Sequence, residues 1–476
     1  MKNFFRKVAF GLKPEEKVPS DPLTWAQKQV ETIPELNWKG KYIYSEKEMR
    51  KYWITQRVEE NTTLRKKYKN DSKGLEIAER QLENDTGGKF WKNYELSIRH
   101  AEGVRSSHPV LAKLWYFWGN HFAISEKDFL ARYSTGAYQR EAIRSNMNQN
   151  FEKMAQEATI AWPMIHHLDN EQNVGPNSEK GIKRRARRKD ASINENHARE
   201  LLELHTVSPN SGYKQEDIVQ MAYIMTGWRP KWGKTRLETG DVHFDSQYHQ
   251  PGKKKVLGKE YNNGKKSLAV AIKDFSNHPS CIEFIAMKLC RYLITDYPTK
   301  DMIDPIIKAW KKSDGYLPEI HKAAIEVAFN YSEKFNKFQN PENWLLQMVK
   351  MADINLIPSP DHMGLYNLGM KPLKSQRSLE NLLKELGHHP YLAQQPNGWS
   401  DLSQDWMSPE LLIRRLVYAK QAYFQMKSKN QNNEFYEEMI AKNFDKPEEI
   451  IKILAKNNNP YHKHVILFNL PEMLKS

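Results

Sequence analysis

Apolar residues recur at three- and four-residue intervals along most of this chain, and this spacing restricts the fold more than any other feature. In an α-helix such residues line one face, which can pack against a core. Pro, Gly, Asn or Asp residues bound the periodic segments, as expected at helix ends. The pattern predicts a mainly α-helical protein, with helices at residues 96–118, 139–168, 194–206, 215–227, 279–295, 302–312, 318–330, 341–352, 376–387, 408–427, 433–442 and 446–456.

Residues 228–264 interrupt the helical pattern. This stretch contains seven Gly or Pro residues and two short strand-like runs, at 241–244 and 255–257. Such an arrangement is typical of loops and hairpins. We therefore expect a loop or short-hairpin excursion from the helical body here, and a second excursion, polar and basic, at residues 171–193.

The composition indicates a folded chain. Thirteen Trp residues among 476 are too many for a disordered protein, which lacks the apolar surface to offset its ordering entropy. We predict one large helical domain over residues 1–427, with its core at 101–427 and an N-terminal helical part at 1–100. Residues 428–476, rich in Lys and Asn, are expected to form a peripheral helical extension.

The cysteines, the apolar runs and the N-terminus indicate where in the cell the protein is expected. Cys281 and Cys290 are the only cysteines, and nine residues apart on a helix they point to opposite faces and cannot bridge. No apolar run approaches the roughly 20 residues that cross a membrane. The apolar part of the N-terminus is shorter than the roughly 7–15 residues of a secretory signal. We expect reduced thiols, no membrane insertion and a cytoplasmic protein.

The densest group of chemically active side chains lies in the predicted helix 194–206. At 100° per residue, one arc of about 140° contains Glu195, Asn196, Arg199, Glu200 and Glu203. Arg199 lies four residues from both Glu195 and Glu203 and can pair with either, whereas Glu200 has no such partner. Asn194 and Asn196 complete the polar set, and His205 lies on the apolar arc.

Three interpretations of this helix stay open. The first is an ion-pair ladder that orients the helix. The second is a site for zinc, iron or manganese formed by Glu200, Glu203 and a histidine. On an ideal helix, His205 lies about 140° or more from both glutamates. The metal site would therefore need His121 or His249 as a ligand, unless the helix ends by about Leu204. The third is a metal-free acid–base site in which Arg199 holds an anion.

A basic run precedes the helix. Seven cations fall within residues 180–189, after the turn-like sequence Gly175-Pro176-Asn177-Ser178. So many cations cannot be buried, so we expect a solvated loop. It could be merely solubilising, form a local anion site, or bind nucleic acid through counterion release, although no groove-binding motif accompanies it.

Several blocks of the sequence resemble a known family. In chain order they are Trp118-Gly119-Asn120-His121-Phe122; Leu168-Asp169-Asn170 with Gly175-Pro176-Asn177-Ser178; the 194–206 run; Gly212-Tyr213 with Asp217; Thr226-Gly227-Trp228; His249, Gly252, Lys254, Leu257 and Gly258; His278-Pro279 with Lys288-Leu289; and Pro396, Gly398, Trp399, Asp401 and Trp406. Over roughly residues 8–425 they are similar to the large bacterial family catalogued as domain of unknown function 1800.

The resemblance implies much about identity and little about activity, because the family has no established reaction. Its members are often encoded beside proteins that resemble the alkaline phosphatase and sulfatase fold, and many carry export signals. This chain departs from the family in two places. Its Phe10-Gly11 enters the family pattern almost at once, which leaves no room for an export signal, and Gln250 stands where many relatives have Asp.

The leading hypothesis is an enzyme-like site for a substrate bearing phosphate, sulfate or carboxylate, with or without a divalent metal. Arg199 would hold the anion, Glu200 would be the general base, and His121 or His249 would be an acid or metal ligand. The catalytic candidates are Glu200, Glu203, His121 and His205, and the metal candidates are His249, His121, Glu200 and Glu203. The anion-binding candidates are Arg199, Glu195, Asn194, Asn177, Ser178, Arg184, Arg185, Arg187, Arg188 and Lys254.

Two alternatives belong to other functional classes. The first is a non-catalytic module that binds an acidic protein or polyanion and assists a neighbouring phosphatase- or sulfatase-like protein. The second is nucleic-acid binding without sequence preference, for which the basic run at residues 180–189 is the main indication.

Overall fold

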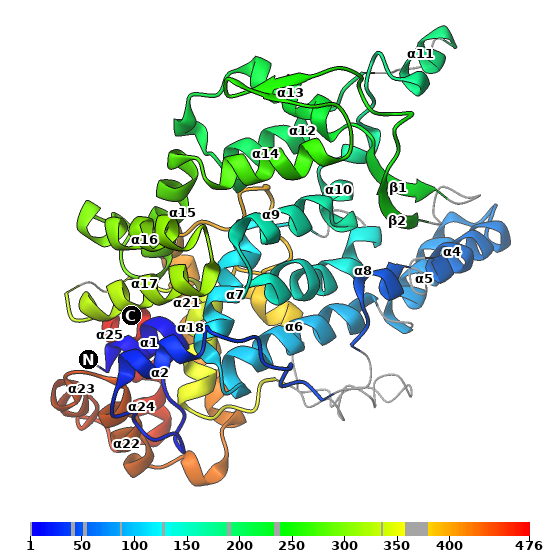
Figure 1. Ribbon diagram of the computed structural model, residues 1–476. Helices are drawn as coiled ribbons and strands as arrows, with labels where there is room; N and C mark the ends of the chain where they lie inside the picture. The colour runs from blue at the N-terminus through cyan, green and yellow to red at the C-terminus, as the bar shows by residue number, and fades with distance from the viewer. Residues whose placement is uncertain are drawn as a thin grey trace.

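The computed structural model describes residues 2–39, 43–50, 55–85, 88–125, 129–187, 192–232, 239–334, 337–357 and 379–476. The predicted mainly α-helical fold is confirmed, since strands form only two small hairpins among these residues (Figure 1).

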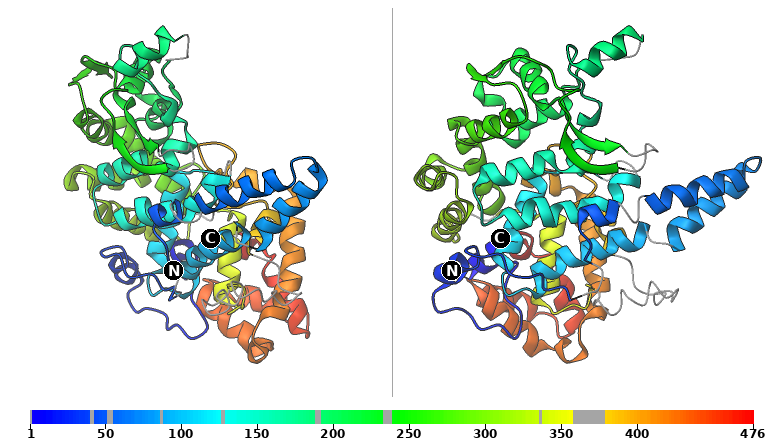
Figure 2. Two further views of the ribbon diagram at one scale, coloured as in Figure 1. Left: turned by 90° about the vertical axis from the view of Figure 1, so that its right-hand side faces the viewer. Right: turned by 45° about the vertical axis from the view of Figure 1, so that its right-hand side comes forward.

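The first ten α-helices lie between residues 3 and 167, and some of them form the centre of the molecule. They are α1 (Asn3–Ala9), α2 (Pro22–Lys28), α3 (Glu46–Glu48), α4 (Thr55–Lys67), α5 (Ser72–Asp85), α6 (Gly88–Arg105), α7 (Pro109–His121), α8 (Phe129–Tyr138), α9 (Phe151–Ile160) and α10 (Trp162–His167). Figure 2 shows that α4 and α5 form a hairpin that projects from the body.

The middle of the chain forms the upper part of the molecule as drawn in Figure 1. Its helices are α11 (Glu179–Ala186), α12 (Asn196–Glu200), α13 (Gln215–Met225), α14 (Lys266–Ser276), α15 (Pro279–Leu293), α16 (Lys300–Ser313) and α17 (Leu317–Asn330). The remaining helices are α18 (Pro341–Met351), α20 (Leu379–Glu385), α21 (Pro409–Ala422), α22 (Asn433–Asn443), α23 (Pro447–Leu454), α24 (Pro460–Leu467) and α25 (Pro471–Leu474).

The excursion expected at residues 228–264 is confirmed as two antiparallel hairpins. In the first, β1 (Trp228–Trp232) pairs with β2 (Thr239–Phe244), with Trp228 opposite Phe244. In the second, β3 (Lys254–Val256) pairs with β4 (Lys259–Tyr261). The β3 strand packs against α13, so the second hairpin is fastened to the helical body.

Helices α7 and α18 lie at the centre. Every residue of α18 is buried, and Asn120 is the only residue of α7 that is not. Helices that are enclosed on all sides belong to the core of a large domain. Both pack near α6, and α1 packs on α7, so the N-terminal part of the chain belongs to this core.

The two ends of the described chain lie side by side (Figure 1). The Arg6 guanidinium donates to the carbonyl of Asn443 at 3.1 Å, and the Lys7 ammonium donates to Ser476 at 2.8 Å. Helices α22–α25 are therefore joined to α1 by buried polar contacts. The domain division at residues 427 and 428 stays a prediction.

Several predicted helices differ from those observed. Residues 96–118 span two helices because Pro109 starts α7 after a break, and proline suits a first helical position. Residues 139–168 comprise a π-helical segment Gln139–Ile143, a short 3₁₀ turn, α9 and α10. The basic stretch at 180–189 was expected to be a loop, but its residues up to Ala186 belong to α11, whose first turn is capped by Ser178. Residues 188 and 189 lie outside the described part of the chain.

Two findings concern the cysteines and the length of the helices. Cys281 and Cys290 are both free and buried in α15, and burial raises the pKa of each thiol. Among the described helices, none combines the length and apolar character needed to cross a membrane.

Candidate functional site

The predicted acidic helix has an irregular end. Helix α12 stops at Glu200 and a π-helical segment, Leu201–His205, follows it. A π-turn contains more residues than an α-turn, so the side chains beyond Glu200 are rotated relative to the helical wheel. This rotation changes which pairs can form.

The Arg199 side chain forms one of its two predicted pairs. Its guanidinium contacts Glu195 at 3.2 Å and Gln215 at 3.1 Å, and the Gln215 amide donates to Glu195 at 2.6 Å. The predicted Arg199–Glu203 pair is wrong, because Glu203 instead accepts a hydrogen bond from Tyr213 at 2.9 Å. This arrangement matches the ion-pair interpretation, with Arg199 already occupied by protein partners.

Glu200 lies half-buried on the same element. Burial raises the pKa of its carboxyl, Glu203 raises it further, and Arg199 lowers it. A general base with a raised pKa is chemically reasonable. The two histidines proposed to act with Glu200 have other partners: His121 contacts Lys288 and His249 contacts Lys254.

His121 and His205 are buried together at the ends of their helices. The rings are 6.2 Å apart, and His121 Nε2 lies 3.2 Å from the carbonyl oxygen of His205. The Lys288 ammonium donates to His121 Nδ1 at 3.1 Å, so we assign the His121 proton to Nε2. Burial lowers the pKa of His205 to about 3 and that of His121 well below its ordinary value. Both rings are neutral at pH 7.

His249 and Lys254 form a second buried pair. His249 Nδ1 donates to the carbonyl of Thr226 at 2.8 Å, and its Nε2 accepts from Lys254 at 3.0 Å. Lys254 also donates to Asn263 at 2.9 Å. Burial lowers the pKa of Lys254 to about 8 and that of His249 to about 4. These contacts fasten the second hairpin to the end of α13.

The predicted metal ligands are therefore not brought together. His121 is bonded to Lys288 and His249 to Lys254, while Glu203 is bonded to Tyr213. Among the residues whose positions are described, no group of three or more His, Cys, Asp or Glu side chains is placed to hold a metal ion.

The remaining anion candidates hold α11 in place or lie on its surface. Ser178 caps the helix through Gly181, and the Asn177 amide donates to the Gln250 side chain at 2.9 Å. Asn194 accepts from the backbone of Asn196 at 3.0 Å. Arg184 lies beside the Tyr248 ring, and the exposed residues are Arg185 and Arg187. Arg188 lies outside the described residues.

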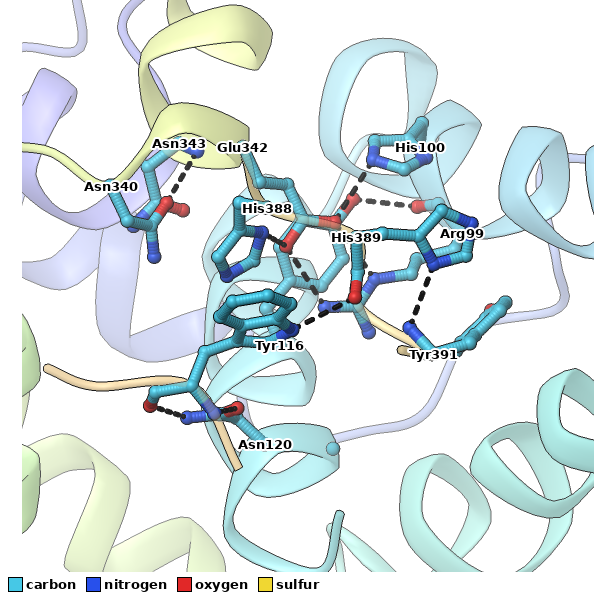
Figure 3. A network of polar contacts seen from close by, with 12 residues as sticks. Arg99, His100, Tyr116, Asn120, Asn340, Glu342, Asn343, His388, His389 and Tyr391 are labelled. Atoms are coloured by element: carbon cyan, nitrogen blue, oxygen red, sulfur yellow. Dashed lines mark hydrogen bonds and ion pairs between the residues drawn. The ribbon is translucent and has the colours of Figure 1, made fainter. Parts of the chain in front are cut away.

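A different polar cluster occupies the centre of the molecule (Figure 3). Glu342 on α18 accepts from Arg99 Nε at 3.1 Å and lies 2.9 Å from His100 Nε2. His388, from the segment after α20, approaches the other Glu342 oxygen at 3.9 Å. Arg99 and His100 come from α6, so three distant segments meet here.

Glu342 is ionised within this cluster. Burial alone would raise the pKa of its carboxyl, but Arg99, followed by His100 and His388, holds the pKa well below its ordinary value. Burial lowers the pKa of His388 to about 4, so this ring is neutral at pH 7. The cluster thus contains a compensated ion pair between Arg99 and Glu342.

A π-helical segment supplies another member of the cluster. Gln139 accepts from Arg99 at 2.9 Å and donates to the carbonyl of Gly119 at 3.3 Å. A Cβ atom at Gly119 would lie 2.8 Å from the Gln139 oxygen, so a larger residue here would displace the Gln139 side chain from these hydrogen bonds. Single π-turns are frequent at functional sites, and the π-segments Gln139–Ile143 and Leu201–His205 both lie near α7.

Asn120 connects α7 to the segment that closes the cluster. Its amide nitrogen donates to the carbonyl of Trp399 at 2.8 Å, and its oxygen accepts from the Trp399 backbone at 2.8 Å. The Trp399 indole donates to the carbonyl of His389 at 2.8 Å. This reciprocal pair holds Ser400 and Asp401 against the end of α7.

Two small polar cavities lie between these elements. The larger, about 20 Å³, is lined by Arg99, Tyr116, Gly119, Asn120, Gln139, Tyr292, Asn340, Glu342, His388, Pro390, Trp399, Ser400 and Asp401. The smaller, about 10 Å³, shares Tyr292, Asn340, Ser400 and Asp401 with it. In this conformation each cavity accommodates a molecule about the size of water.

Asp401 borders both cavities, and three cations are near enough to affect the pKa of its carboxyl. Burial raises the pKa of its carboxyl, although Lys288, Lys337 and Arg291 oppose this change. Lys337 is paired with Asp296 at 2.6 Å, whereas Lys288 contacts the neutral His121 ring. Three cations therefore face two carboxylates. We call Asn120, Lys288, Asn340, His388 and Asp401 the interior polar site.

Part of this site could have been found from the sequence blocks that resemble the family. Three of its blocks meet here, namely those that contain Asn120, Lys288 and Asp401. Arg99, Glu342 and His388 carried no such signal, because each is a single polar residue in an otherwise ordinary helical or loop sequence.

Comparison with known proteins identifies the family and no more. The curated proteins and the solved structures contain no match. The family described as protein of unknown function (DUF1800) matches residues 3–473, which extends the predicted match at both ends. Because this match covers nearly the whole chain, the protein belongs to the DUF1800 family.

Proposed function

We propose that the protein binds a small anion at the interior polar site and transfers a proton to or from it. The observation that carries this proposal is Asp401, a carboxyl with a raised pKa that borders two small cavities lined by polar side chains. Lys337 also lines the smaller cavity, and Lys288 acts on the carboxyl from outside the two linings. The proposal keeps the predicted anionic substrate and moves its site from the 194–206 helix to the centre of the molecule.

The charges favour an anion as the ligand. Lys288 has a neutral imidazole as its hydrogen-bonding partner, so its charge is compensated only at longer range by Asp401. Protonation of Asp401 would leave Lys288 with still less compensation. A bound phosphate, sulfate or carboxylate would replace that negative charge, and it would do so where burial strengthens electrostatic attraction.

The acid–base step would use Asp401. A carboxyl whose pKa is raised toward the working pH can both donate and accept a proton. Asn120, Asn340 and Ser400 line the cavities and supply neutral hydrogen-bonding groups that orient a ligand. The Arg99–Glu342 pair would fix the wall of the site.

Substrate entry requires movement of the cavity wall. Cavities of about 20 and 10 Å³ hold water-sized ligands only. The segment around Trp399 and Asp401 is held to α7 chiefly by the two Asn120 hydrogen bonds. Displacement of this segment would enlarge the site.

A direct test compares two carboxylate variants. We expect the protein to hydrolyse 4-nitrophenyl phosphate or 4-nitrophenyl sulfate with water as the nucleophile: Asp401 would accept the proton of the attacking water as the bond to 4-nitrophenolate breaks. Asp401→Asn should then lower the rate of 4-nitrophenolate release by about 100-fold or more. Glu200→Gln serves as the matched control, because Glu200 is also a carboxyl with a raised pKa. Loss of activity in Glu200→Gln with full activity in Asp401→Asn would contradict the proposal.

A cytoplasmic location also remains a proposal. It is supported by the two free thiols, since reduced cysteines are the rule in the cytosol. Fractionation of cells that express the tagged protein would test it.

A further inference from the structure

Helix α11 projects from the upper part of the molecule (Figures 1 and 2). Its base is held by backbone contacts with the segment before β3. The Gly175 amide donates to Tyr248 at 2.9 Å, and the Lys180 amide donates to Gln247 at 2.9 Å. A helix fastened at one end in this way presents its remaining surface to solvent in a fixed direction.

Close packing at the base reinforces this orientation. A Cβ atom at Gly181 would lie 2.2 Å from the carbonyl oxygen of Gly175, so only glycine fits there. Arg229 lies over the Tyr248 ring at 3.7 Å and Arg184 lies over the same ring at 5.5 Å. The inner side of α11 is therefore fixed by glycine contacts and by cation–π contacts.

The outer side of α11 combines positive charge with an apolar side chain. Residues 179–187 carry five cations and one carboxylate, Glu179, which pairs with Lys183 at 2.6 Å. Ile182 is 54% exposed, and Ala186, one turn later, is also exposed. Arg185 is exposed on the same side, one turn after Ile182, and Arg187 is exposed where the helix ends. We call Ile182, Arg185, Ala186 and Arg187 the α11 face.

We propose that the α11 face docks an acidic protein surface that also offers apolar side chains. Arginine forms bidentate contacts with carboxylates, which suits it to acidic protein partners. An exposed Ile next to Ala gains nothing from a sugar–phosphate backbone, but it can be buried against apolar side chains of a protein. The combination favours a protein over a nucleic acid.

The experiment measures binding by the full chain with three labelled probes. The first probe is a helical peptide of Glu and Leu residues, and the second is poly-L-glutamate of equal charge. The third is a DNA duplex of about 20 base pairs, or roughly two turns. We expect the Glu/Leu peptide to bind tightest. Arg185→Glu with Arg187→Glu should weaken it about tenfold or more, in line with charge reversal at a contact.

Two controls separate the α11 face from general basicity. Lys311→Glu with Lys312→Glu makes the same change in net charge at an exposed part of α16 and should leave the affinity within about twofold. Ile182→Ser should weaken binding of the Glu/Leu peptide about threefold or more and leave poly-L-glutamate unaffected. All these side chains are exposed, and circular dichroism would verify folding.

Three results would overturn the proposal. One is tighter binding of DNA than of the Glu/Leu peptide, which would indicate a polyanion surface. Another is an equal loss of affinity in the α16 control, which would indicate net charge alone. The third is the absence of measurable binding of the Glu/Leu peptide by the unmodified protein.

Discussion

Arg99 and Glu342 carry opposite charges at the centre of the molecule, where each side chain is no more than 3% exposed. Removing one member of such a pair leaves an unpaired charge in a poorly solvating environment. Replacing Arg99 or Glu342 alone should therefore destabilise the fold around the interior polar site strongly. Replacing both residues with apolar ones should change the free energy of unfolding much less.

We expect Arg99→Met to lower the free energy of unfolding by about 3–5 kcal/mol, because Glu342 would remain buried without its guanidinium partner. Urea unfolding followed by circular dichroism measures this change. The double variant Arg99→Met with Glu342→Leu should recover part of the loss. A loss below about 1 kcal/mol in the single variant would show that Glu342 is solvated or otherwise paired.

Residue-level prediction from the sequence depended on local spacing. The Arg199–Glu195 pair was predicted because its members lie on one helix. Arg99 and Glu342 are 243 residues apart, so no periodicity connects them. The sequence could place individual charges on helices but could not bring together α6, α18 and the His388 segment.

Irregular helices explain where the structure differs from the elements predicted from the sequence. A π-segment after Glu200 rotates Glu203 toward Tyr213, a change that an ideal helical wheel does not anticipate. Pro109 divides a predicted single helix into α6 and α7. The strongly periodic helices α13, α15, α17 and α18 were predicted to within a few residues of their ends.

The Asn120 hydrogen bonds should control local opening of the segment around Trp399. Asn120→Ala removes two hydrogen bonds worth about 1 kcal/mol each, which corresponds to roughly a 30-fold loss of protection. Hydrogen exchange of residues 396–403 measures this effect. Asn458→Ala, at an exposed position, should leave exchange there unchanged. Equal protection in both variants would show that other contacts hold the segment.

Gly181→Ala tests the packing at the base of α11. Alanine improves helix propensity by about 1 kcal/mol over glycine, so propensity alone predicts a more stable helix. The contact with the Gly175 carbonyl predicts the opposite, namely faster hydrogen exchange in α11 and at residues 245–250. Lys183→Ala, which alters an exposed side chain, is the control. Slower exchange in Gly181→Ala would contradict the close packing.

Buried neutral histidines are distributed across the whole molecule. Burial lowers the pKa of His205, His321 and His464 to about 3, and that of His249 and His388 to about 4. In the unfolded chain these rings titrate near 6.5, so below that pH the unfolded state binds more protons. Stability is therefore full above pH 6.5 and falls as the pH decreases toward 4.

We expect the urea midpoint to decrease between pH 7 and pH 5. Each such histidine contributes a slope of up to about 1.4 kcal/mol per pH unit over that range. Unfolding curves at pH 7, 6 and 5 test this expectation. His321→Gln, at a ring that accepts from Trp118 at 2.8 Å, should reduce the slope. A midpoint that is constant over this range would mean that the rings are solvated.

The central claim is that an anion binds beside Asp401, and proton uptake on binding tests it most directly. An anion placed next to the carboxyl should raise its pKa further, so binding should take up protons over the pH range in which this carboxyl titrates. Calorimetric titration with inorganic phosphate in buffers of different ionisation enthalpy measures this uptake. We predict that Asp401→Asn reduces it while Glu200→Gln leaves it unchanged. An identical uptake in Asp401→Asn and the unmodified protein, or a loss confined to Glu200→Gln, would contradict the account.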